Sequence, residues 1–168
     1  MLLEDPELAA CLPVAVRGRA IEECLADVVR LSPGRWDPPR TPVLSSGIGL
    51  LVLDGLLIRR VGVDGRFGAE LLGDGDLLRP WQGPDSSPPL PRTTGWRLLA
   101  PTRLALLDER AAESLARYPS LTGCMVAKAV ERARNLAVNL AIVHQPRTDV
   151  RLQMLFWDLA DSWGRVRA

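Results

Sequence analysis

Two arginines on either side of a proline-rich stretch are the residues of this sequence best suited to hold a ligand. Arg79 precedes the segment 82–91 and Arg92 follows it, and Trp81 and Trp96 stand beside them. A guanidinium group presents several donors in one plane and pairs well with anions, and a tryptophan ring supplies an apolar wall. The sequence predicts a candidate site for a small anionic ligand, the alternatives being an exposed Arg92 and a structural ion pair at Arg79.

The other reactive side chains do not form a catalytic set. His144 is the only histidine, and no glycine-framed serine lies near it, so a hydrolytic nucleophile would lack its base. The carboxylate pairs Glu22-Glu23 and Asp74/Asp76 are expected to be solvated on a helix face and in a turn. We therefore expect no enzyme activity and no metal site.

Three cysteines, Cys11, Cys24 and Cys124, are odd in number and widely spaced, without a CxxC pair. This pattern fits reduced thiols better than a disulfide framework. We expect small buried apolar side chains, with redox sensing as the alternative. Three scattered cysteines also do not provide the ligand set of an iron–sulfur cluster.

Composition points to one well-buried core in a cytoplasmic protein. The 168 residues are 47% hydrophobic, and 21 basic against 20 acidic residues leave a formal charge of +1. No clustered basic surface indicates nucleic-acid binding. The N-terminus lacks the basic start of a signal peptide, and no apolar run is long enough to cross a membrane, so we expect no membrane partner.

Three Asp-Gly pairs recur at ten-residue spacing in the middle of the chain. Glycine adopts the positive φ of tight primed turns without steric cost, so Asp-Gly between short apolar runs such as 49–53 and 56–58 is a hairpin signal. The pattern predicts an antiparallel barrel or β-roll over residues 41–108, closed by a last hairpin from 96–100 to 102–107. The pairs are Asp54-Gly55, Asp64-Gly65 and Asp74-Gly75.

Two short helices and two loops are predicted around these strands. Apolar residues at helical spacing favour helices over 4–11 and 21–31. Four prolines predict a loop over 32–42, and four more predict another over 82–95. Residues 1–40 are therefore expected to form N-terminal helices and a loop that leads to the first strand.

A long helix with one apolar stripe is predicted over residues 120–144. Asp108 is the predicted N-cap of a short helix over 109–118. The short helix and the long helix together make up the predicted helical segment 109–145. Alternating spacings of three and four residues form the seam of a two-stranded coiled coil, which predicts a homodimer. The alternative is a helix that buries the same stripe against its own barrel. The stripe consists of Val126, Ala129, Ala133, Leu136, Leu140 and Val143.

A last helix is predicted over 150–163, with Thr148 or Asp149 as its cap and Gly164 at its end. It gives the segment 147–168 an apolar face. This face consists of Leu152, Leu155, Phe156 and Leu159.

In this order, the parts resemble the Crp/Fnr superfamily of bacterial transcription regulators. The residues that carry the resemblance are GDGDLLRPW at 73–81, WRLLAPTRLALLD at 96–108 and the segment 151–166, and the likeness covers about 40–166. It implies a mainly β fold with added helices. This is a double-stranded β-roll, a jelly roll like the cyclic-nucleotide-binding domain, flanked by N-terminal helices and followed by a long dimerisation helix.

The resemblance implies the sensor and dimerisation part of a DNA-binding regulator. Regulators of this family continue into a winged helix-turn-helix, so the segment 147–168 is expected to lead to it, and DNA would be bound only through that domain, which this chain lacks. The alternative is a stand-alone cyclic-nucleotide-binding-like module with a degenerate pocket that acts through dimerisation or a protein partner. A cupin-type enzyme would need a histidine set that the sequence lacks.

The resemblance also implies where an effector would bind. In cyclic-nucleotide-binding members a Gly-Glu pair holds the ribose and an Arg-Ser run pairs with the phosphate. Arg92, Thr93 and Thr94 match that run, whereas Arg79-Pro80 stands at the Gly-Glu position without a carboxylate. This departure argues against cyclic AMP and leaves an anionic effector of unknown identity.

Two residues of the long helix, Arg132 and Asn135, are candidates to lie over the mouth of the roll, with a solvated face as the alternative. A haem cofactor is not expected, because the lone histidine His144 suits the C-terminal end of a helix better. No other cofactor is predicted.

Overall fold

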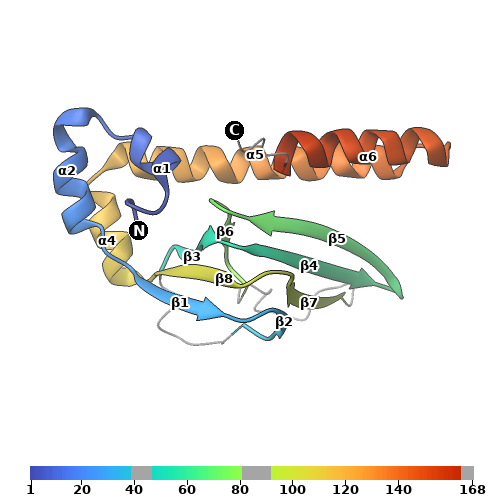
Figure 1. Ribbon diagram of the computed structural model, residues 1–168, viewed down its shortest axis with the longest axis horizontal. Coiled ribbons are helices and arrows are strands. Elements are labelled where there is room, and N and C mark those ends of the chain that lie inside the picture. The colour runs from blue at the N-terminus through green and yellow to red at the C-terminus, as the bar shows by residue number, and fades with distance from the viewer. Residues whose placement is uncertain (39–46, 81–91, 164–168) are drawn as a thin grey trace. The chain divides into compact units, whose positions relative to one another are not determined.

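Two four-stranded sheets, antiparallel throughout, pack against each other as a β-roll (Figure 1). The computed structural model describes residues 1–38, 47–80 and 92–163. The strand order is β1-β8-β3-β6 in the first sheet and β2-β7-β4-β5 in the second. The strands of the first sheet are β1 (Asp27–Leu31), β3 (Gly49–Asp54), β6 (Leu77–Leu78) and β8 (Thr102–Leu107), and those of the second are β2 (Gly34–Trp36), β4 (Leu56–Val63), β5 (Arg66–Gly73) and β7 (Arg92–Leu98).

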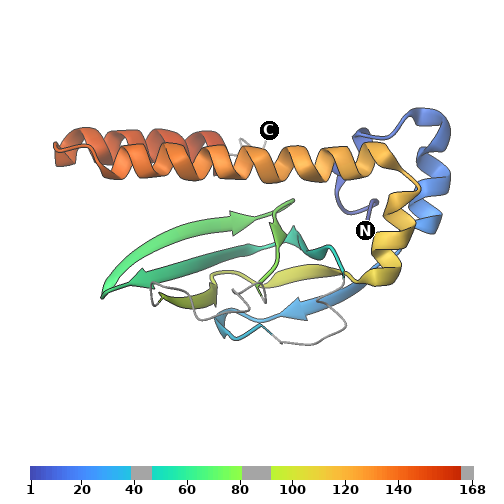
Figure 2. The same cartoon turned by 180° about the vertical axis from the view of Figure 1, so that it is seen from behind.

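Helices precede and follow the strands. The chain divides into two compact units, Met1–Ala129 and Val130–Ala168, with the boundary inside the long helix α5. In the first unit, both views show α1, α2 and α4 gathered at one end of the roll (Figure 1, Figure 2). The helices are α1 (Pro6–Ala10), α2 (Val14–Glu23), α4 (Glu109–Ala116), α5 (Pro119–Val143) and α6 (Thr148–Trp163).

The two central strands of the first sheet, β3 and β8, are buried on both faces. Leu50 and Val52 of β3 pack in the roll interior with the second sheet, whereas Leu51 and Leu53 pack with the helices on the other side. A strand with one solvated face would alternate apolar and polar residues. Burial on both sides explains why residues 49–53 are almost continuously apolar.

The helices cover the outer face of the first sheet. Their apolar side chains and those of β3 and β8 form one buried cluster, which joins the roll to the first turns of α5. The members of this cluster on helices include Leu8, Ala20, Leu115, Leu121 and Met125, and Leu2 and Leu12 join it from the segments before and after α1.

A carboxylate at the end of α2 ties this helix to the base of α5. Glu23 accepts hydrogen bonds from Arg19 Nε at 2.6 Å and from the Tyr118 hydroxyl at 2.9 Å. The hydrogen bond from Arg19 is the main reason that the pKa of Glu23 is lowered from its usual value. Because Tyr118 immediately precedes α5, the network fixes the start of the long helix.

Only one of the three Asp-Gly pairs connects two paired strands. Asp64 and Gly65, with φ of 48° and 73°, form the hairpin turn between β4 and β5. The pair at 54–55 carries the chain from β3 in the first sheet to β4 in the second, and the pair at 74–75 returns it to β6. The turns were predicted correctly, but the prediction that all three are hairpins was wrong.

The two crossover turns contact each other. Asp74 Oδ1 accepts a hydrogen bond from the amide of Gly55 at 3.1 Å. Gly55 has a φ of +123°, and a Cβ at this position would lie 2.5 Å from Thr102 Oγ1. Glycine is therefore required at this crossover by both backbone conformation and space.

Two strands lie in the segment that was predicted as N-terminal helices and a loop. The predicted helix over 21–31 was wrong after residue 23, because α2 ends at Glu23 and β1 pairs with β8. The loop predicted over 32–42 contains β2, in which Trp36 pairs with Trp96 of β7. In both cases pairing with a distant strand outweighs the local pattern.

The closing hairpin was also predicted wrongly. β7 pairs with β2 and β4, and β8 pairs with β1 and β3, so the two strands lie in different sheets. β7 begins at Arg92, inside the loop predicted over 82–95, and residues 81–91 of that stretch lie outside the described part of the chain.

The helices after the roll agree with the sequence pattern. Asp108 Oδ1 accepts a hydrogen bond from the amide of Ala111 at 3.0 Å, which confirms it as the N-cap of α4. α5 and α6 match the predicted long helix and last helix to within two residues at each end.

The prediction of reduced cysteines was wrong for two of the three. Cys11 and Cys124 form a disulfide, whereas Cys24 is a buried free thiol as predicted. The two partners are 113 residues apart in the sequence, and the packing of α1 on α5 brings their Cα atoms within 6.5 Å. Such proximity depends on tertiary structure and cannot be read from cysteine spacing.

We predict that Gly55→Ala lowers the free energy of unfolding by about 1–3 kcal/mol, because alanine meets both a strained φ and the Thr102 side chain. Gly18→Ala is the matched control. Gly18 lies inside α2 with no atom within 4 Å of an added Cβ, so this change should stabilise by about 0.5–1 kcal/mol. Urea unfolding measures both, and equal effects would contradict the assignment.

Candidate functional site

Two charged side chains occupy inward-facing positions of the second sheet. Side chains two residues apart on a strand point to the same face. Leu57 of β4 lies in the roll interior, so Arg59 has an inward position as well. Its partners in register are Glu70 on β5 and Trp96 on β7. The interior of the roll therefore contains an arginine and a glutamate beside an aromatic pair.

These side chains form a connected cluster. Arg59 Nη2 lies 2.7 Å from Glu70 Oε2, and the guanidinium carbon lies 5.9 Å from the ring centroid of Trp96. Trp96 in turn meets Trp36 edge to face, with centroids 5.7 Å apart. The arginine thus has both an ion pair and a cation–π contact.

Arg59 has one buried hydrogen-bond donor, its Nε, that lacks an acceptor among the described residues. Arg59 Nε is inaccessible to solvent and has no hydrogen-bond partner in the described part of the chain. A buried donor without a partner costs free energy, so this nitrogen is suited to receive an acceptor from a bound molecule. A carboxylate or phosphate oxygen is such an acceptor.

The predicted ligand residues are distributed over two sheets. Arg92 and Thr94 share the face of Trp96 by strand alternation, and Arg92 pairs with Val63 beside the hairpin turn. Thr93 points to the opposite face, where its hydroxyl lies 2.6 Å from the position that a Cβ would occupy if Gly62 carried a side chain.

The remaining predictions for the roll involve Arg79 and Trp81. Arg79 follows β6 in the first sheet, and its side chain passes over Gly49. Its Cγ lies 3.1 Å from the position that a Cβ would occupy if Gly49 carried a side chain. Arg79 and Arg92 therefore start from different sheets. Trp81 lies outside the described residues.

Arg132 and Asn135 belong to the second unit, on α5. Arg132 is partly buried and Asn135 is exposed. Their predicted place over the mouth of the roll stays a prediction.

The sequence contained a signal for Arg59 that our reading did not use. In β4 the arginine stands between Leu57 and Val61 at the same alternation, and Glu70 occupies the facing position on β5. A charged residue at an inward position of an apolar strand is informative. Trp36 could not be placed, because its strand was predicted as loop.

The apolar stripe of α5 is exposed on the single chain. Val126 and Leu140 are 58% and 61% exposed, and the other four stripe residues are also exposed. Other faces of the same helix are buried, for example at Leu121 and Met125. The stripe residues of α5 are therefore apolar side chains that are exposed among the described residues.

Within the described ranges, no group of three or more histidine, cysteine, aspartate or glutamate side chains is arranged to hold a metal ion. Over the same ranges, none of the helices combines the length and apolar character that crossing a membrane requires.

Comparison of the coordinates with solved structures reveals the architecture. A double mutant of CooA from Carboxydothermus hydrogenoformans aligns over 93% of this chain and 97% of its own, with a TM-score of 0.57 and 16% identity. A cysteine-to-serine variant of CprK complexed with OCPA aligns over 94% of this chain and 69% of its own, with a TM-score of 0.56 and 14% identity.

A putative transcriptional regulator of the Crp/Fnr family from Eubacterium rectale aligns over 94% of this chain and 72% of its own, with a TM-score of 0.52 and 14% identity. The chain has a Crp/Fnr-like fold. This confirms the predicted double-stranded β-roll with flanking helices and a long helix after it. The likeness is one of structure, because no family model and no curated protein matches the sequence.

Proposed function

We propose that this chain is the effector-sensing and dimerising part of a Crp/Fnr-type DNA-binding transcription regulator. The observation that carries the proposal is a Crp/Fnr-like roll packed on the base of a long helix whose apolar stripe is exposed. A sensor needs a ligand site and a dimer surface that are mechanically connected, and this chain has candidate residues for both.

The effector is proposed to be a small anion with an aromatic or other flat apolar part. Arg59 supplies a cation with a buried unpaired donor, and Trp36 and Trp96 supply an apolar wall at the same level of the roll. Arg92 and Thr94 share this face nearer the hairpin. Cyclic AMP is disfavoured, because Arg79-Pro80 stands where the ribose-binding carboxylate would be.

The connection between roll and helix is proposed to run through the first sheet. Leu50 and Leu51 are neighbours on β3, one in the roll interior and the other in the cluster with α4 and the start of α5. A ligand that changes the interior can therefore change how α5 is held. Its effect would be a shift between two populations of the dimer.

DNA contact is assigned to a winged helix-turn-helix domain rather than to this chain. The near-neutral charge of +1 supports this, since neutralising phosphates requires clustered lysine and arginine. A stand-alone module that acts only through dimerisation or a protein partner is the second candidate. The missing carboxylate at Arg79-Pro80 favours it, since a degenerate pocket would lose such a group first.

We predict that the chain is a dimer and that Leu140→Glu weakens the dimer at least about tenfold, because it places a charge in an apolar seam. Ala141→Glu is the matched control, since this exposed neighbour lies about 100° round the helix. Sedimentation velocity over a concentration series measures both variants. A monomeric wild-type chain, or equal effects of the two substitutions, would contradict the seam.

We predict that an aromatic carboxylate or another flat anion raises the melting temperature of the chain, because a ligand that binds only the folded state stabilises it. Arg59→Met should abolish the shift. Arg60→Met should keep it, since Arg60 is exposed on the outer face over Phe67. If nucleotides, aliphatic carboxylates and aromatic carboxylates all leave the melting temperature unchanged, the stand-alone module is the better account.

A further inference from the structure

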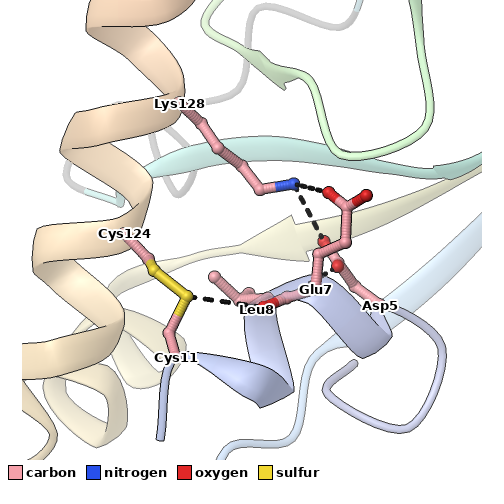
Figure 3. A network of polar contacts seen from close by, with 6 residues as sticks. All are labelled: Asp5, Glu7, Leu8, Cys11, Cys124 and Lys128. Carbon is pink, nitrogen blue, oxygen red and sulfur yellow. Dashed lines mark hydrogen bonds and ion pairs between the residues drawn. A yellow bond between two sulfur atoms is a disulfide. The ribbon is translucent and has the colours of Figure 1, made fainter.

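Helix α1 is fastened to the dimerisation helix at both of its ends (Figure 3). Cys11, which follows α1, forms the disulfide with Cys124 in the second turn of α5. Lys128, one turn further along α5, lies with Nζ 3.0 Å from Glu7 Oε2 and 3.9 Å from Asp5 Oδ2. A covalent bond and an ion pair therefore hold the same short helix.

The ion pair lies where three elements meet. Asp5 is buried, and its other carboxylate oxygen caps α1 by accepting from the amide of Leu8 at 2.9 Å. Lys128 Nζ lies 2.6 Å from the place of a Cβ on Gly75, so the ammonium also stands against the turn between β5 and β6. A movement of α1 would disturb both the roll and α5.

The segment 1–12 depends on its contacts with the rest of the unit for its order. α1 has five residues, which is too short for a helix that is stable in isolation. Leu2, Leu8 and Leu12 are each at most 2% exposed and pack in the cluster that contains Leu121 and Met125 of α5. If the segment leaves, an apolar surface at the base of α5 becomes exposed.

The two disulfide partners differ from the third cysteine. Cys11 and Cys124 are partly exposed residues, and access favours exchange with a reductant. Cys24 is 1% exposed, and burial raises the pKa of its thiol, so it is a poor nucleophile for disulfide exchange. Disulfide exchange is thus confined to one pair.

We propose that the Cys11–Cys124 disulfide is a reversible redox latch, which holds the segment 1–12 on α5 when oxidised and releases it when reduced. The proposal goes beyond the sensor function and does not depend on it. The latch also leaves the dimer stripe free. Cys124 and Lys128 are four residues apart on one face of α5, whereas Val126 and Ala129 lie on another.

The chemistry is thiol–disulfide exchange with a dithiol reductant. A thiolate of the reductant attacks one sulfur, forms a mixed disulfide and displaces the other cysteine as a thiolate. The second thiol of the reductant then breaks the mixed disulfide. The reductant ends as its own disulfide, and Cys11 and Cys124 end as two thiols that have gained two electrons and two protons.

Reduction of the disulfide changes which local unfolding events are possible in the segment 1–12. In the oxidised chain α1 remains linked to α5 however its other contacts fluctuate, so its amides exchange only through a wider opening. In the reduced chain the segment can detach locally, and local openings cost less than global ones. We expect the amides of residues 1–12 to exchange at least about thirtyfold faster after reduction, which corresponds to the lower end of what a native disulfide contributes.

Hydrogen–deuterium exchange of the full chain, equilibrated with oxidised or reduced dithiothreitol, tests the latch. The peptide covering 1–12 should respond, the peptide covering β8 should stay within about twofold, and reoxidation should restore the slow rate. Cys24→Ala should keep this response. The double variant Cys11→Ser/Cys124→Ser should exchange like the reduced chain in both buffers, and alkylation with mass measurement reports the thiol state in each sample.

Three results would overturn the proposal. The first is free thiols at Cys11 and Cys124 in the oxidised buffer, because then no latch forms. The second is complete reduction without faster exchange of 1–12, because then the bond holds nothing. The third is equal acceleration in the 1–12 and β8 peptides, because then the disulfide stabilises the whole unit and is not a local latch.

Discussion

The burial of the central strands β3 and β8 on both faces is the constraint on which the rest of this structure depends. These strands of the first sheet alternate between two apolar clusters, one inside the roll and one under the helices. A sheet with two dry faces needs a cover on each side. The second sheet provides one cover, and α1, α2, α4 and the start of α5 provide the other. The roll and the base of the long helix are therefore parts of one packed unit.

This arrangement gives the proposed function its physical route. The interior cluster lies beside Arg59, Trp36 and Trp96, where an anionic effector could bind, and the outer cluster lies against the first turns of α5. Well-packed interiors resist deformation, so a change on one side of the sheet is transmitted to the other. In the proposed function, the exposed stripe further along α5 is the surface at which a second subunit would respond to such a change.

Local sequence signals predicted the helices and turns well and the strand partners poorly. Asp108 as a cap, the long helix after Pro119 and the tight turn at 64–65 depend on nearest neighbours, and all three are confirmed. The pairing of Trp36 with Trp96 and the bond between Cys11 and Cys124 join distant segments. No periodicity encodes such contacts. In the candidate site, Arg92 and Thr94 share the strand face of Trp96 but are exposed, so their role as ligand residues stays a prediction, and Arg59 was passed over.

Distance measurement along the proposed seam tests the central claim most directly. Spin labels carried by an unnatural amino acid at Ala127 or at Ala141, both exposed and outside the stripe, leave the native cysteines intact. A parallel two-fold seam predicts short and similar distances between the two subunits at both positions. An antiparallel pair would separate the labels at one or both positions by about 21 Å or more along the axis, at 1.5 Å per residue. That result, or the absence of any dipolar signal, would contradict the account.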